Sequence, residues 1–242
     1  MYLNLKMALI IDIETIGADF DSLDEVTRHN LTRWINRQAG DDKEKFNVLL
    51  KDLKEGFGFS PLTGEIAAIG VFDTEKNKGV VYFQALDIEI SEYNEASFCF
   101  KPKTEKEMLK AFWQGVLKYK TFVTFNGRSF DIPFLLIRGA VHKIKPTLNL
   151  MSNRYLRSQY GTVRHIDLLD QFSFYGAVRR RGNLHLYCNA FGIRSPKAEG
   201  ITGDDVSRLF KEKKYKEIAE YNSWDLIATW ELYQVWKKYI NI

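Results

Sequence analysis

Cysteine is scarce in this sequence: only Cys99 and Cys188 occur among 242 residues, and they lie far apart. Neither has a second cysteine or a histidine at metal-ligand spacing, so neither a zinc module nor a disulfide framework is indicated. Long apolar runs are also missing. The longest one near the N-terminus, residues 7–11, ends at Asp12, far short of the roughly 20 residues of a membrane span, and nothing there is typical of a signal peptide. We therefore expect a soluble, cytoplasmic protein without a membrane partner.

A glycine-rich phosphate-binding loop is missing after the first predicted strand, which argues against a doubly wound dinucleotide fold and against a small-molecule organic cofactor. No repeat, low-complexity tract or proline-, glycine- or serine-rich linker divides the chain either. We predict a single domain over residues 1–242, interrupted by a charged helical insertion at about residues 19–58.

Charge is distributed unevenly along the chain, although the formal net charge is only +4. Residues 1–100 carry 10 lysines and arginines against 18 acids, whereas residues 101–200 carry 18 against 6. A strongly basic middle segment is typical of proteins that bind a polyanion, of which nucleic acid is the commonest in a cytoplasm. Clustering along the sequence does not establish clustering in space.

The apolar pattern predicts an α/β fold. Residues 7–15 are apolar on both alternating faces, as in a central strand that is covered on both sides. Residues 65–73 and 79–84 form a predicted hairpin, so the first three strands are expected to be antiparallel. A further strand is predicted at residues 121–125. Helices are predicted at residues 23–38, 41–55, 103–120, 131–141, 165–174, 183–191, 204–210, 215–221 and 224–239.

Acidic residues stand at several predicted strand and helix ends. Asp12 and Glu14 share one face of the first strand, where a buried charged pair is costly unless a metal ion or another partner compensates it; the alternative is a strand end that reaches solvent. Asp131 follows a glycine turn at the start of a predicted helix, and the alternative for it is a simple helix N-cap. Tyr221 and Asp225 are four residues apart and share a helix face.

Together these residues resemble a known family. The segments D-I-E at 12–14, N-x-x-x-F-D at 126–131 and Y-x-x-x-D at 221–225 are similar in order and distance to the three motifs of DEDDy-type 3′–5′ exonucleases. Within that group the chain is most similar to predicted stand-alone exonucleases related to the proofreading domain of family B DNA polymerases. The resemblance implies a ribonuclease H-like fold, with a mixed central sheet flanked by helices. It does not account for the insertion at about residues 19–58.

The resemblance also implies the chemistry. Asp12, Glu14, Asp131 and Asp225 would hold two divalent cations, Mg²⁺ or Mn²⁺, and Tyr221 would orient the attacking water. Carboxylates are hard ligands that suit these ions, and two ions can promote in-line attack on a phosphodiester. The implied activity is release of nucleoside 5′-monophosphates from the 3′ end of single-stranded DNA or RNA.

Further residues around these motifs are predicted to contact substrate. For several of them an ordinary structural role is the alternative: a turn for Asn126, core packing for Phe130, and a solvated loop for the arginines. Asp167 would be an outer-shell acid or a substrate-loop residue. The predicted substrate-contacting residues are Thr15, Asn126, Phe130, Asp167, Arg179, Arg180 and Arg181.

The competing hypothesis is a nucleic-acid-binding or scaffold domain that keeps this fold but has weak or no catalysis. The complete set of acids and Tyr221 counts against it. The sequence does not separate a DNA exonuclease from an RNA-trimming enzyme, because a few contacts to the 2′-hydroxyl decide that preference.

Overall fold

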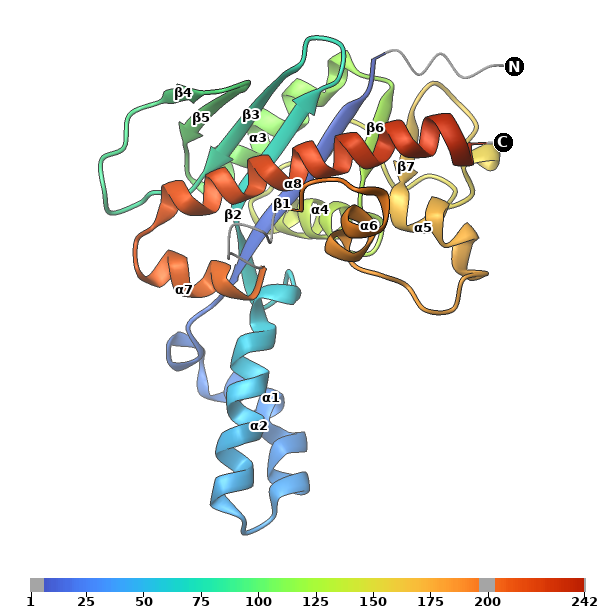
Figure 1. The fold of residues 1–242 in the computed structure, drawn as a ribbon. Helices are drawn as coiled ribbons and strands as arrows, with labels where there is room; N and C mark the ends of the chain where they lie inside the picture. The colour runs from blue at the N-terminus through green and yellow to red at the C-terminus, as the bar shows by residue number, and fades with distance from the viewer. Residues whose placement is uncertain (1–6, 196–202, 242) are drawn as a thin grey trace.

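A seven-stranded sheet organises the protein. The computed structural model describes residues 7–195 and 203–241, and the sheet has the order β4-β5-β3-β2-β1-β6-β7 (Figure 1). The first three strands are antiparallel, as predicted, while β6 and β7 run parallel to β1. The strands are β1 (Leu9–Gly17), β2 (Gly64–Asp73), β3 (Lys78–Phe83), β4 (Tyr93–Glu95), β5 (Phe98–Pro102), β6 (Thr121–Thr124) and β7 (Arg164–Asp167).

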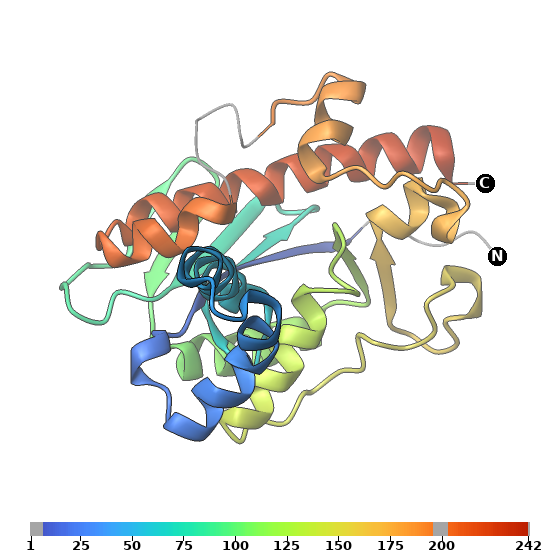
Figure 2. The same ribbon diagram turned by 90° about the horizontal axis from the view of Figure 1, so that it is seen from below.

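Helices cover both faces of the sheet, and Figures 1 and 2 show α8 crossing one face while α3 and α4 lie against the other. Within the described ranges, no helix is long and apolar enough to cross a bilayer. The helices are α1 (Glu25–Ala39), α2 (Lys43–Glu55), α3 (Glu105–Gly115), α4 (Asp131–Val141), α5 (Leu168–Phe172), α6 (Leu184–Phe191), α7 (Val206–Lys211) and α8 (Tyr215–Val235), which continues as a π-helical turn (Trp236–Ile240).

Strand β1 lies between two apolar cores, which explains why its sequence is apolar on both faces. Ile10 and Ile16 pack in the core on the α8 side, whereas Ile11 and Ile13 pack in the core on the α3 and α4 side. Alternation along the strand therefore places Asp12 and Glu14 on the α8 side.

Helices α1 and α2 form an arm that projects away from the sheet (Figure 1). Asp24 and Asp42 cap the two helices, each accepting a hydrogen bond from a backbone N–H three residues on. Gly40 allows the turn between them, with a φ of 57° that most residues avoid. At the base of the arm, the Thr15 hydroxyl donates to the Gly58 carbonyl at 2.6 Å.

Two element predictions were wrong, and two short strands were missed. Residues 165–174 do not form one helix: His165 to Asp167 pair with β6 as an edge strand, and only Leu168–Phe172 are helical. Strands β4 and β5 were not predicted, because each is too short to show a periodic pattern. The two final predicted helices are a single helix, α8, which runs without a break through residues 222 and 223.

Candidate active site

The carboxylates of β1 emerge beside a break in the regular sheet. A β-bulge lies between Glu14 and Thr15, which changes the register between β1 and β2. Bulges of this kind often re-aim side chains next to active sites. Glu14 is buried and Asp12 is half-buried, and both face α8.

Asp131 reaches the same region from α4. Strand β6 pairs with β1 only at Leu9 and Ile10, so the backbone of β1 beyond them has no strand partner on that side. The buried Asp131 carboxylate occupies this position and accepts the Ile13 backbone N–H at 3.1 Å. Its side chain therefore does more than cap α4, whose N-cap residue is Phe130.

Helix α8 supplies the remaining groups. Tyr221 is buried, and a hydrogen bond joins its side chain to that of Asp225, one turn later. Burial, followed by the negative charge of Asp225 and of the β1 acids, raises the pKa of Tyr221 well above its usual range. The phenol therefore stays protonated at every working pH and acts as a hydrogen-bonding group.

Asp12, Glu14 and Asp225 form an acidic cluster, hereafter the acidic cluster. One carboxylate oxygen from each lies within 4.8 Å of those of the other two. Burial raises the pKa of both Asp12 and Glu14 well above the usual range, and the charges of Asp225 and Asp131 raise it further. Burial also raises the pKa of Asp131 to about 7. Three hard oxygen ligands that repel one another at this distance fit a divalent cation such as Mg²⁺ or Mn²⁺.

A pocket of about 160 Å³ opens beside this cluster. Asp12, Tyr221 and Asp225 form one side of it. The opposite side comes from the end of β6 and from α6 and the segments flanking it. The residues there are Phe125, Asn183, Leu184, His185 and Ser195, with His185 Nδ1 lying 2.6 Å from the Ser195 hydroxyl.

Comparison with known proteins agrees with this geometry. Residues 66–240 match the family described as predicted 3′–5′ exonucleases related to the exonuclease domain of PolB. The chain belongs to this family. The match includes Asp131, Tyr221 and Asp225, and it begins after β1 and the α1–α2 arm.

Individual relatives of the chain are distant. The chain is 23% identical over 91% of its length to DNA polymerase 1 of Sulfurisphaera ohwakuensis, and 26% identical over 85% to a DNA polymerase of Pyrococcus glycovorans. It spans 26% of each of these polymerases. It is also 26% identical to an uncharacterized protein of Methanocaldococcus jannaschii, over 75% of this chain and 90% of that one.

The fold has a solved counterpart in the family B DNA polymerase of Pyrobaculum calidifontis. The TM-score is 0.57 and the identity 14%, over 96% of this chain and 24% of the polymerase. The predicted ribonuclease H-like fold is therefore confirmed.

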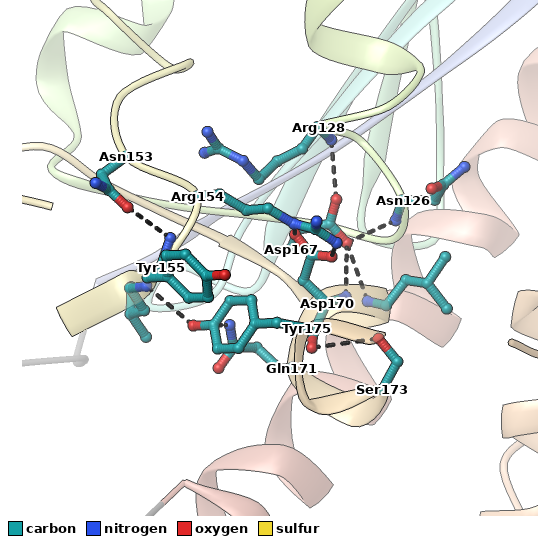
Figure 3. A network of polar contacts seen from close by, with 12 residues as sticks. Asn126, Arg128, Asn153, Arg154, Tyr155, Asp167, Asp170, Gln171, Ser173 and Tyr175 are labelled. Carbon is teal, nitrogen blue, oxygen red and sulfur yellow. Dashed lines mark hydrogen bonds and ion pairs between the residues drawn. The ribbon is translucent and has the colours of Figure 1, made fainter. Parts of the chain in front are cut away.

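Asp167 fixes the loop that leads from β6 to α4, and Figure 3 shows its contacts with Asn126 and Arg128. Its carboxylate accepts the backbone N–H of Asn126 at 3.0 Å and that of Arg128 at 2.9 Å, and it also caps α5. These bonds hold Asn126 at a φ of 64°, which is uncommon outside glycine. Asp167 is not among the three clustered acids, so its observed contacts are those of a loop-positioning residue.

His165 supports the same loop from below. Its Nδ1 lies 2.9 Å from the Leu150 carbonyl and must carry the proton, so Nε2 accepts from the Thr124 hydroxyl, also at 2.9 Å. Thr124 Oγ1 in turn accepts the Gly127 N–H at 3.2 Å. Burial lowers the pKa of His165 to about 4, so the imidazole is neutral in the folded protein.

This histidine predicts a pH-dependent stability. The pKa of His165 is about 4 in the folded state and about 6.5 in the unfolded state. The free energy of unfolding is therefore highest above pH 6.5 and falls as the pH is lowered toward 4, because the unfolded state then binds a proton that the folded state does not. Between pH 7 and pH 5 the loss is about 2 kcal/mol. Urea unfolding of wild type and His165→Asn at both pH values measures it. The stability difference between the two proteins should shrink at pH 5; a constant difference would contradict the neutral, buried imidazole.

The other residues predicted to contact substrate differ in their burial and in their neighbours. Thr15 uses its hydroxyl on Gly58, at the base of the arm. Phe130 is half-buried and packs against Phe134, with ring centroids 5.5 Å apart. Residues 179–181 are exposed in the loop that leads to Asn183 at the pocket. The Asn126 side chain points away from the polar network of Asp167 (Figure 3).

Sequence reasoning missed two residues near the cluster. His185 lies in a predicted helix without any motif around it, so no signal singles it out. Asn222 donates from Nδ2 to Asp12 Oδ2 at 2.7 Å. The position of Asn222 next to Tyr221 was the available signal. The helical period alone does not show which of the two residues beside Tyr221 faces the sheet.

Proposed function

We propose that this member of the PolB-related exonuclease family hydrolyses the 3′-terminal phosphodiester bond of single-stranded nucleic acid and releases nucleoside 5′-monophosphates. The observation that carries the proposal is the convergence of Asp12, Glu14 and Asp225 within 4.8 Å, beside a pocket that Tyr221 also lines. In this proposal the pocket receives the terminal nucleotide.

The chain's own residues have separate tasks in the reaction. Asp12, Glu14 and Asp225, with Asp131 beside them, would hold two divalent cations, which when bound supply Lewis-acid stabilisation of the charge that develops on the phosphate. Tyr221 donates to Asp225, so its oxygen can accept a hydrogen bond from the attacking water and aim it at phosphorus. The water gives up a proton to solvent as its oxygen bonds to phosphorus, the bond to the 3′ oxygen breaks, and that oxygen takes up a proton from solvent.

We propose that one exonuclease domain extends along the chain and that the α1–α2 arm is an insertion in it. The arm leaves from the end of β1 and returns at β2, which are paired strands of the same sheet. The second candidate, a binding domain without catalysis, predicts strand binding without any shortening. The clustered acids favour the enzyme, because their repulsion has no structural benefit in a domain that only binds.

A digestion experiment tests the proposal. A 5′-labelled linear single strand, as DNA and as RNA, is incubated with Mg²⁺ or Mn²⁺, and a circular single strand of the same sequence serves as the control. We expect the linear strand to shorten from its 3′ end and the circle to survive. Cutting of the circle, or tight binding of the linear strand with no shortening, would contradict the proposal.

The arginines at positions 179–181 are expected to contact the phosphates of the strand. Replacing all three by glutamine should weaken single-strand binding. The slope of the logarithm of the binding constant against the logarithm of the salt concentration should become shallower by about one for each lost phosphate contact. Replacing the exposed Lys43, Lys45 and Lys51 of α2 by glutamine removes the same charge from the arm and is the matched control. Fluorescence anisotropy at several salt concentrations measures both slopes. An equal reduction in the two variants would show a general charge effect and no contact.

A further inference from the structure

Asn222 contacts the acidic cluster through Asp12, although it stands at an unspecified position of the third motif. It is fully buried on α8, between Tyr221 and Asp225 in sequence. Its Nδ2 donates to Asp12 Oδ2 at 2.7 Å. One neutral amide thus holds the Asp12 carboxylate of β1.

The opposite end of this amide explains a glycine in the neighbouring strand. Gly70 of β2 pairs directly with Asp12. A Cβ at Gly70 would lie 1.9 Å from Asn222 Oδ1 and 2.6 Å from the Leu226 Cδ1 methyl. The Leu226 methyl is the end of a flexible side chain and can move, whereas Asn222 cannot retreat without leaving Asp12. Glycine at position 70 therefore leaves the space that the Asn222 side chain occupies.

Burying the Asn222 amide at this position costs free energy. Asn222 Oδ1 is buried and finds no hydrogen-bond donor among the described residues. An unpartnered buried carbonyl typically costs about 1–3 kcal/mol. An apolar side chain at this position would avoid that cost, so the amide has a use that fold stability does not supply.

We propose that Asn222, packed against Gly70, is a positioning residue that holds Asp12 in a metal-binding arrangement. The inference rests on the proposed function only in that the cluster binds divalent cations. By donating to Asp12, the amide fixes that carboxylate in the metal-free protein, where repulsion from Glu14 and Asp225 would drive it away. Metal binding then requires less rearrangement of the ligands.

The test is direct titration of the protein with Mn²⁺ by calorimetry, without substrate. Asn222→Ala should weaken Mn²⁺ binding by about 10- to 100-fold, the usual cost of losing a group that orients metal ligands. The matched control is Thr229→Val. Thr229 is buried on the same helix, its hydroxyl has no partner among the described residues, and valine has nearly its shape. That variant should bind Mn²⁺ as wild type does.

A double-mutant cycle tests the role of the glycine. Gly70→Ala should weaken Mn²⁺ binding as much as Asn222→Ala, and the double variant should be no worse than either, because both changes act through one amide. Asn222→Ser, which keeps a small polar side chain but cannot span to Asp12, provides a second variant if alanine does not fold, and the same weakening is expected.

Unchanged Mn²⁺ affinity in a folded Asn222 variant, or additive losses in the double variant, would overturn the proposal. Failure of the proposed function looks different: wild type would bind Mn²⁺ and lose that affinity on substitution of Asn222, yet shorten no strand.

Discussion

Asp12→Asn should abolish most of the activity and at the same time raise the Tm of the metal-free protein. Turnover is expected to fall by at least about a thousandfold, because a neutral amide replaces a charged ligand in a cluster that stabilises developing charge. The Tm of the metal-free variant should rise, because burial and the charges of Asp225, Asp131 and Glu14 raise the pKa of Asp12 in the wild type. A carboxyl whose pKa is raised on folding weakens the fold once the pH exceeds its unfolded pKa, and asparagine removes that penalty.

Asp73→Asn is the matched control. Asp73 is also a buried acid in the sheet, but hydrogen bonds from the backbone of Lys76 and Glu75 and from the Tyr119 hydroxyl outweigh its burial and lower its pKa. This variant should lose stability and keep its activity. The two Tm values, measured in EDTA at pH 7.5, and kcat on a labelled oligonucleotide decide the matter. Less than a tenfold loss of turnover in Asp12→Asn would remove Asp12 from the site.

Tyr221→Phe should retain metal and strand binding but lower kcat by about ten- to a thousandfold. The phenol carries no charge at working pH, so its loss removes a group that positions the attacking water and leaves the metal ligands in place. The effect is therefore expected in kcat, with the Mn²⁺ affinity unchanged.

Tyr233→Phe controls for the loss of a buried hydroxyl on the same helix. The Tyr233 hydroxyl has no hydrogen-bond partner among the described residues, and the site lies three helical turns away. Its removal should leave kcat unchanged. If Tyr221→Phe has normal turnover and only a lower Tm, Tyr221 is a core tyrosine and not part of the reaction.

The fold was predictable where periodicity is long and local. Residues 7–15 show on their own that β1 is covered on both faces, and the hairpin of β2 and β3 follows from two runs separated by a polar loop. Strand β7 could not be found in this way, because its four residues are followed directly by a helix and share its apolar character. Only pairing with β6, some forty residues earlier, makes it a strand.

The site was predictable for pairs within one element and not for contacts between elements. A period of two places Asp12 and Glu14 on one face, and a helical turn places Tyr221 beside Asp225. Two contacts join residues more than a hundred positions apart: the hydrogen bond from Ile13 to Asp131, and the packing of Asn222 against Gly70. No local pattern encodes them, since they depend on how β1, β2, α4 and α8 pack.

The most direct measurement is the product series from a 5′-labelled single strand digested in Mn²⁺ by wild type and by Asp225→Asn, with and without EDTA. We expect wild type to give a ladder that shortens one nucleotide at a time, with nucleoside 5′-monophosphates as the only released product. EDTA and the Asp225→Asn substitution should each stop it. Internal cuts, 3′-monophosphate products or a ladder that continues in EDTA would contradict the account of Asp12, Glu14 and Asp225 as the metal-binding centre of a 3′–5′ exonuclease.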